Sequence, residues 1–136
     1  LARPASAVRR SNHNSKDREG YIVIAVIFEV LPAAGATDTY FDLAGRLKPA
    51  LETIDGFISV ERFESVTQPG KFLSLSFWRD EAAVAVWRNT LPHRQAQNAG
   101  RHGVFAGYRL RVAQVLRDYG LDDREQAPAD SRNHHQ

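Results

Sequence analysis

The chain has 136 residues, enough for one domain, and 43% of them are hydrophobic, so it can bury a core of its own. It has no cysteine, which excludes disulfides and thiolate metal sites, and its formal net charge of +2 comes from scattered arginines, so we expect no nucleic-acid partner. No apolar run approaches about 18 residues and the start lacks the apolar core of a secretory signal, so we expect a cytoplasmic protein with no membrane partner.

The two ends of the chain differ in composition from its centre. Residues 1–19 and 121–136 are polar and have almost no large apolar side chains, so burial cannot offset the entropy lost on ordering. We therefore expect a disordered N-terminal arm over 1–19, one folded domain over 20–120 and a disordered tail over 121–136. The paired His134 and His135 lie in this tail, where we expect them to be solvated, so no metal site is predicted.

The folded part begins with a strand and a helix. Residues 21–30 are β-branched or aromatic at nearly every position, which predicts a strand covered on both faces. Residues 37–54 carry apolar side chains at helical spacing, with Thr37 or Asp38 available as N-cap. Pro49 predicts a kink in this helix or its early end.

A hairpin follows. Asp55 and Gly56 mark a turn, residues 57–66 read as a second strand, and Gln68-Pro69-Gly70 turns the chain into a third strand over 71–78. On the third strand two small hydroxyl side chains share a face with two large rings: Phe72, Ser74, Ser76 and Trp78. This pattern leaves room beside the serines for a ligand or for a side chain of a neighbouring subunit.

Two short helices and a last strand complete the pattern. Asp80 is a good N-cap for a helix to about residue 89, and Pro92 can begin a second helix that ends near residue 100. Residues 107–116 then alternate as a strand does, with Tyr108 on one face and with Arg109 and Arg111 on the other.

The order β-α-β-β-α-β is that of the α+β ferredoxin-like fold, an antiparallel four-stranded sheet with both helices on one face. The other face of such a sheet would stay exposed and partly apolar in a monomer. We therefore expect a homodimer in which two sheets meet face to face.

Over about residues 20–120 the chain resembles the antibiotic biosynthesis monooxygenase superfamily of dimeric α/β barrels. The resemblance is carried by Ile54 to Phe57, Ser76 to Glu81, Trp87 with His93 to Gln97, and Gly107 to Val112. It implies a dimeric α/β barrel and an oxidoreductase. Members of the family differ in task, and these tasks include cofactor-independent oxidation of polyketide phenols, quinol oxidation and haem degradation.

The haem-degrading branch, as the resemblance implies, uses an asparagine on the first strand, a tryptophan on the second helix and a histidine ten residues later. Trp87 matches the tryptophan, but Gln97 stands ten residues on, and residues 21–30 contain no asparagine. His93 could replace the missing ligand only if the helix register shifted. Haem binding or degradation stays an alternative, and we expect no cofactor.

The cofactor-independent branch must bind a flat ring, assist its deprotonation and stabilise the resulting anion. The resemblance implies a substrate pocket in which Trp87 and Trp78 form apolar walls. His93 is the candidate base, and Trp87 is a second catalytic candidate beside it. The remaining candidates would neutralise a phenolate or orient a carbonyl of the substrate: Arg109, Arg111, Arg94, Tyr108 and Gln97.

The expected substrate is a planar phenol, quinol or polyketide-like compound, which is oxidised with O₂. Each of these residues could instead serve only in packing or ion pairs. A non-catalytic dimer that binds a small hydrophobic molecule is therefore a third hypothesis.

Overall fold

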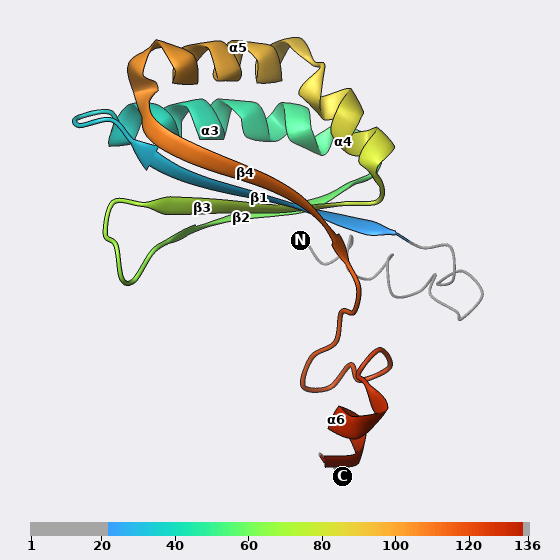
Figure 1. The fold of residues 1–136 in the computed structure, drawn as a ribbon. Coiled ribbons are helices and arrows are strands. Elements are labelled where there is room, and N and C mark those ends of the chain that lie inside the picture. Colours follow the sequence, from blue (N-terminus) through green and yellow to red (C-terminus); the bar gives the residue numbers. More distant parts are fainter. Residues whose placement is uncertain (1–21, 135–136) are drawn as a thin grey trace.

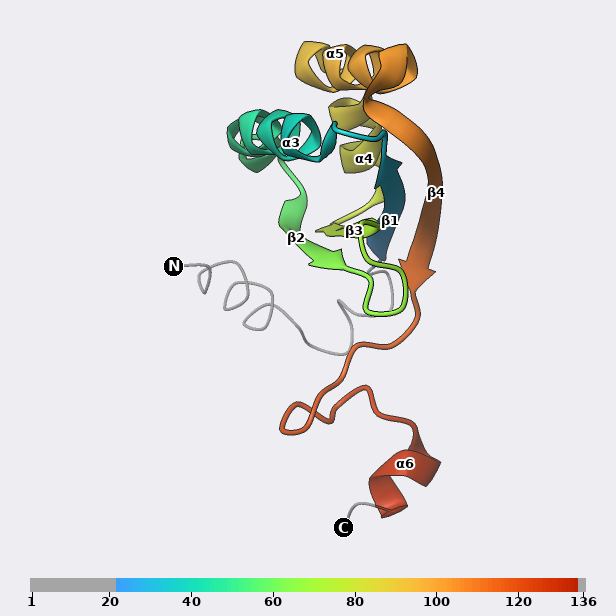
Figure 2. The same cartoon turned by 90° about the vertical axis from the view of Figure 1, so that its left-hand side faces the viewer.

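The computed structural model describes residues 22–134 (Figure 1). Its elements follow in the order β1 (Val23–Pro32), α3 (Thr37–Glu52), β2 (Phe57–Glu64), β3 (Phe72–Trp78), α4 (Glu81–Arg88), α5 (Leu91–Ala99), η1 (Gly100–Val104), β4 (Phe105–Val115) and α6 (Ala129–His134). The strands form one antiparallel four-stranded sheet in the order β2-β3-β1-β4. Helices α3, α4 and α5 lie on one side of it, and the chain after β4 leaves toward the other (Figure 2). The predicted ferredoxin-like α+β fold is confirmed.

Strand alternation decides which side chains meet the helices. Ile24 of β1 pairs with Trp78 of β3, and Val30 pairs with Phe72. All four are buried, so they define the helix side of the sheet. The odd-numbered residues of β1 and β3 point to the opposite surface, here called the outer face, which carries Ala25, Ile27, Glu29, Leu73, Leu75 and Phe77.

The core on the helix side consists of two clusters. The first joins Trp78 and Ile24 of the sheet to α3 and α4, and its buried members are Ile24, Leu51, Trp78, Ala83, Val84 and Trp87. The second lies near the start of α3, where Tyr40 packs with Val30 and Phe72. Phe28 and Phe105 border this second cluster and are partly exposed to solvent.

The turn before β2 is held against the turn before α4. The backbone N–H of Arg79 donates to the carbonyl of Gly56 at 2.7 Å, and its guanidinium pairs with Asp55 at 3.1 Å. Asp80 caps α4, because its carboxylate accepts the N–H of Ala83 at 2.9 Å, and this bond is the largest cause that lowers the pKa of Asp80. The predicted cap is confirmed, and two segments that carry the family resemblance are in direct contact.

The start of α3 differs from the prediction. The N-cap is Ala36 rather than Thr37 or Asp38, and no side chain caps the helix. Both predicted residues lie inside the first turn instead, where the carboxylate of Asp38 suits the positive end of the helix. The helix also continues through Pro49 and ends at Glu52.

The ends of the chain are described only in part. Residues 1–19 lie outside the described residues, so their disorder stays a prediction. In the predicted tail 121–136 the structure has the short helix α6, an element that the sequence did not predict. Between residues 22 and 134, no helix is both long enough and apolar enough to cross a membrane.

Candidate functional site

Helices α4 and α5 are joined at Thr90. The Thr90 hydroxyl donates to the carbonyl of Trp87 at 2.9 Å and accepts the N–H of His93 at 3.3 Å. Thr90 therefore ends one helix and caps the next, which fixes His93 relative to Trp87. The sequence analysis missed this residue, although a threonine just before a helix with proline in its first turn is a recognisable start signal.

The ring of His93 meets the edge of Trp87. Their ring centroids are 5.2 Å apart and their planes cross at 65°. Trp87 is buried in the first core cluster with 8% of its surface exposed, whereas His93 is half-buried. Neither ring nitrogen of His93 has a hydrogen-bond partner among the described residues. The imidazole is thus held by packing and its nitrogens are free for another group.

The surroundings of His93 favour the neutral imidazole. Burial is the largest cause that lowers its pKa below the ordinary value of 6.5, and the positive charges of Arg94 and Arg88 lower it further. At neutral pH the ring is therefore uncharged and can accept a proton. This protonation state is the one that a general base needs.

Gln97 lies on the same inward face of α5 as His93, one turn further along, and both are half-buried. The side-chain oxygen of Gln97 accepts a hydrogen bond from Arg94 at 3.2 Å. Arg94 also donates to Asn89 at 2.6 Å, so its guanidinium is directed along the helix surface. Gln97 is thus beside His93, while Arg94 is exposed.

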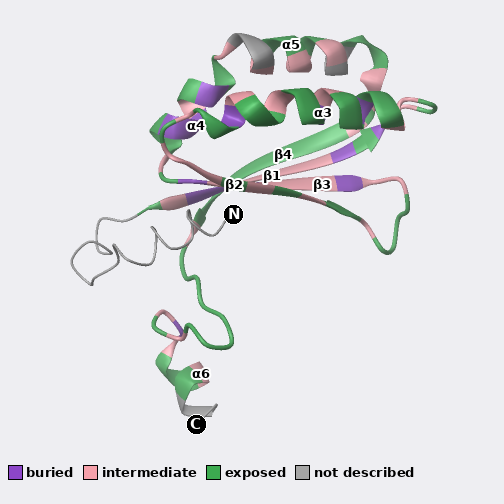
Figure 3. Ribbon diagram, turned by 180° about the vertical axis from the view of Figure 1, so that it is seen from behind, coloured by how far each residue is buried: buried purple, intermediate pink, exposed green. Residues whose placement is uncertain are grey.

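An apolar row lies on the helix side of β4. Tyr108, Leu110 and Val112, here called the β4 row, are 62%, 52% and 44% exposed. They pair across the sheet with Val30, Phe28 and Val26, in that order. Figure 3 shows that β4 is exposed along most of its length. The row runs from the second core cluster toward the first and offers an uncovered apolar surface.

Tyr108 belongs to the far end of this row. Its ring centroid lies 5.7 Å from that of Phe28 and 6.0 Å from that of Phe105. These two phenylalanines were not predicted as site residues, although alternation along the first strand places Phe28 on the side of the sheet that faces the helices. Tyr108 therefore packs beside the second cluster, whereas His93 packs on Trp87 of the first.

Trp78 is placed in the core. It is 1% exposed, and its indole N–H donates to the Ser76 hydroxyl at 2.9 Å. The room expected beside the serines is filled at Ser76 by this indole. Trp78 has no free surface for a ligand in this conformation.

The predicted arginines lie on the other side of the sheet. Arg109 and Arg111 alternate with the β4 row and point to the outer face. The guanidinium of Arg111 pairs with Glu29 at 2.9 Å. The structure therefore brings His93, Trp87 and Gln97 together, with Tyr108 on the same side of the sheet, and places both arginines away from them.

No group of three or more potential metal ligands is formed by the described residues. His93 and Gln97 thus offer a neutral imidazole and an amide on α5, and the β4 row offers an apolar surface on the same side of the sheet. The imidazole can take one proton from a bound molecule, and the row can contact an apolar one.

Comparison with known proteins gives consistent matches. The family model described as antibiotic biosynthesis monooxygenase matches residues 23–99. A protein of Pyricularia oryzae named jasmonate monooxygenase ABM is 50% identical over 93 residues, which are 68% of this chain and 43% of that protein. The uncharacterized protein YqjZ of Bacillus subtilis is 30% identical over 93 residues, which are 68% of this chain and 79% of that protein.

The fold also matches solved structures. The structure of Rv0793 from Mycobacterium tuberculosis superposes with a TM-score of 0.65 at 17% identity, over 72% of this chain and 99% of that one. The chain thus spans less than half of the Pyricularia protein but nearly all of this bacterial fold.

Proposed function

The chain belongs to the antibiotic biosynthesis monooxygenase family, and from this premise we propose that it oxidises a small cyclic organic substrate with O₂ and without a bound cofactor. The observation that carries the proposal is the half-buried, neutral imidazole of His93, whose ring nitrogens have no partner among the described residues. In this proposal His93 is the base, and Trp87 is the positioning residue that sets the angle of its ring.

The chemistry needs little more from the protein when the substrate is electron-rich. His93 takes a proton from a phenol or from an activated ring CH₂ group, and the resulting anion gives one electron to O₂. The radical and superoxide combine to a peroxide anion, which takes the proton back from His93 to give a hydroperoxide, and the hydroperoxide loses water. For a ring CH₂ group the net change is CH₂ + O₂ → C=O + H₂O, so the substrate supplies all the electrons. The β4 row would hold the apolar ring, and Gln97 or Tyr108 would orient its oxygen.

Jasmonate is a second substrate to test, because it appears in the name of a relative that is 50% identical. When a substrate is not electron-rich, it cannot reduce O₂ itself. Inserting one oxygen atom into its C–H bond then requires two electrons from an outside donor, which reduce the other oxygen atom to water. Turnover of jasmonate would therefore depend on an added reductant, whereas turnover of an anthrone or quinol would not. The assay distinguishes the two substrate classes by this dependence.

The test measures O₂ consumption and product formation with an anthrone, a quinol and jasmonate, the last with and without a nicotinamide reductant. We expect His93→Gln to lower turnover by about a hundredfold or more, the usual scale of general-base catalysis. His102→Gln is the matched control, because His102 is exposed on η1 and its Nδ1 lies 2.6 Å from the Asn98 carbonyl. Equal turnover by both variants would contradict the proposal. No O₂ consumption, together with a co-purified ligand left unaltered under air, would favour a binding protein.

The absence of a haem requirement is part of the same proposal. Titration with hemin is expected to give no saturable Soret shift, because Gln97 is a poor iron ligand. A saturable shift that is lost in His93→Gln would instead assign His93 as a haem ligand.

A further inference from the structure

The two edges of the outer face carry opposite charges. The strand order makes β2 one edge of the sheet and β4 the other. On β2 the side chain of Glu61 points to the outer face, because Glu61 pairs with Leu75 of β3. On β4 the same face carries Arg109 and Arg111, which alternate with the β4 row. The outer face therefore has a carboxylate at one edge and guanidinium groups at the other.

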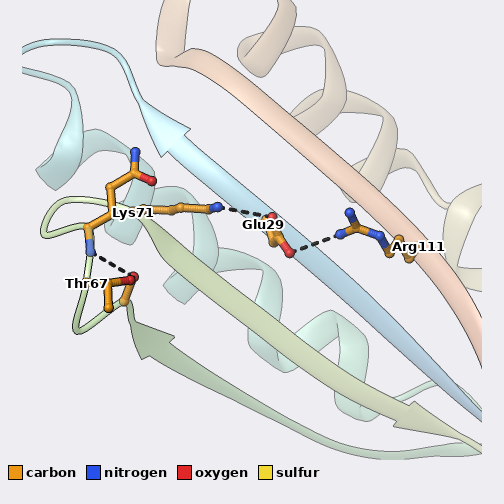
Figure 4. A network of polar contacts seen from close by, with 6 residues as sticks. Glu29, Thr67, Lys71 and Arg111 are labelled. Carbon is orange, nitrogen blue, oxygen red and sulfur yellow. Dashed lines mark hydrogen bonds and ion pairs between the residues drawn. The ribbon is translucent and has the colours of Figure 1, made fainter.

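The basic edge is only partly neutralised within the chain. One carboxylate oxygen of Glu29 lies 3.2 Å from the Lys71 ammonium and the other lies 2.9 Å from the Arg111 guanidinium (Figure 4). Lys71 is the main cause that lowers the pKa of Glu29, and Arg111 adds to it, so the carboxylate is ionised and paired through both oxygens. Arg109 stands directly opposite Glu29 in the β1–β4 pairing, yet its guanidinium has no partner among the described residues.

The acidic edge is unpaired as well. Glu61 is exposed, and its carboxylate has no hydrogen bond or ion pair among residues 22–134. One row of paired residues crosses the whole sheet, from Glu61 through Leu75 and Ile27 to Arg111. Arg109 lies two residues from this row, about 7 Å along β4. Glu61 and Arg109 thus have similar positions along the strands but lie at opposite edges of the sheet.

A second copy on the outer face can bring these two edges together. The sequence predicts that two sheets meet through this face, and in aligned packing their strand directions differ by only about 30°. A two-fold axis between the sheets then runs either along the strands or across them. An axis along the strands keeps each residue at its position along them and sets β4 beside β2 of the second copy. An axis across the strands sets β4 against β4 and β2 against β2, so each edge meets its own charge.

We propose that Arg109 of each copy pairs with Glu61 of the partner subunit, and that this ion pair selects the dimer whose two-fold axis runs along the strands. The pair then occurs twice, because the interface is two-fold symmetric. Each sheet edge meets an edge of the other sheet, as closure into one barrel requires. Contact between the copies removes water from Arg109, which is unfavourable unless a carboxylate is supplied. The ion pair therefore sets the orientation of the copies, while the apolar centre of the outer face supplies contact area.

Charge reversal tests this pair, because its two halves come from different copies. Arg109→Glu brings two carboxylates together at each contact, and Glu61→Arg brings two guanidinium groups together. We expect each variant alone to weaken dimerisation by about tenfold or more. An equimolar mixture forms a heterodimer in which both contacts are again oppositely charged, so its affinity should return to near that of the wild type. Arg46→Glu, at an exposed arginine of α3, is the matched control and should dimerise as the wild type does.

Light scattering on a dilution series measures the dissociation constants, and circular dichroism shows whether each variant is folded. The double variant Arg109→Glu/Glu61→Arg should dimerise as the wild type does, and it gives the same test if a single variant does not fold. A mixture of Arg46→Glu with Glu61→Arg should show no rescue. The proposal is overturned if the wild type is monomeric, if either reversal leaves dimerisation unchanged, or if neither the mixture nor the double variant restores it. None of these readouts uses turnover, so they are independent of the proposed oxidation at His93.

Discussion

His93 is unusual among the described residues because both burial and neighbouring charges favour its neutral form. In the unfolded chain a histidine titrates near 6.5, whereas in the folded chain the pKa of His93 lies lower. Between the lower pKa of His93 in the folded chain and about 6.5, the unfolded chain therefore binds more protons than the folded chain. The free energy of unfolding rises with pH across this window, so the contribution of His93 is fully favourable above it and is lost as the pH falls.

We expect the melting temperature of the wild type to fall more steeply than that of His93→Gln between about pH 7.5 and pH 5. The two curves should become parallel above this range. Circular dichroism melts at several pH values measure the difference. Parallel curves for the wild type and His93→Gln throughout would show that His93 is not held neutral by the fold.

Ser76 has a specific partner in the core, and Ser74, two residues earlier on the same face, has none among the described residues. Ser76→Ala leaves the indole N–H of Trp78 buried without an acceptor, and we expect a cost of about 1–3 kcal/mol in the free energy of unfolding. Ser74→Ala should cost about 0.5 kcal/mol or less.

Urea unfolding at constant pH compares the Ser76 and Ser74 variants. In a Trp78→Phe background the difference between them should shrink, because the indole donor is gone. Equal losses from both serine variants in the wild-type background would mean that the indole bond contributes nothing measurable.

The α3–β2 turn and the start of α4 are joined at Gly56. Its φ is +98°, and a Cβ atom there would lie 2.7 Å from the Cβ of Ala83. Gly56→Ala should therefore lower stability by about 2 kcal/mol or more, since it adds a steric conflict to an unfavourable backbone angle.

Gly35 provides the control for this turn. Its φ is +78°, but a Cβ atom there would meet nothing within 4 Å, so Gly35→Ala should cost only about 1–2 kcal/mol of backbone strain. Thermal or urea unfolding of both variants measures the difference. A smaller loss for Gly56→Ala than for Gly35→Ala would contradict the packing of α4 on this turn.

At the level of elements, the sequence predicts the order and type of the strands and main helices, because their periodicity follows directly from which face is buried. The alternation in β4 also places Tyr108 and Arg109 on opposite faces as found. What the sequence cannot supply is tertiary contact. The pattern around Ser76 suggests empty space, yet the Trp78 ring turns back and occupies it. Similarly, periodicity separates the arginines from Tyr108 but does not reveal which face carries His93.

In the part of the chain that the structure describes, helices cover the sheet on one side only (Figure 2). The centre of its outer face is apolar, with Ala113 of β4 paired to Ala25 of β1 and, next to them, Ile27 paired to Leu75. Ala113 is exposed and Ile27 and Leu75 are half-buried, and apolar surface that stays open to solvent in this way is typical of an interface. We propose that two copies of the chain meet through this centre and form the dimeric barrel.

Ala113 allows this proposal to be tested without disturbing the core, because it is exposed on the outer face. Ala113→Glu would place an unpaired charge in the middle of the proposed interface, and we expect association to weaken by about a hundredfold. Gln114→Glu is the matched control, since Gln114 is exposed on the same strand and its pairing with Ile24 puts it on the helix side. Size-exclusion chromatography with light scattering should give a dimer for the wild type and Gln114→Glu, and a folded monomer for Ala113→Glu. A monomeric wild type, or an Ala113→Glu variant that stays dimeric, would show that the outer face is not where the copies meet.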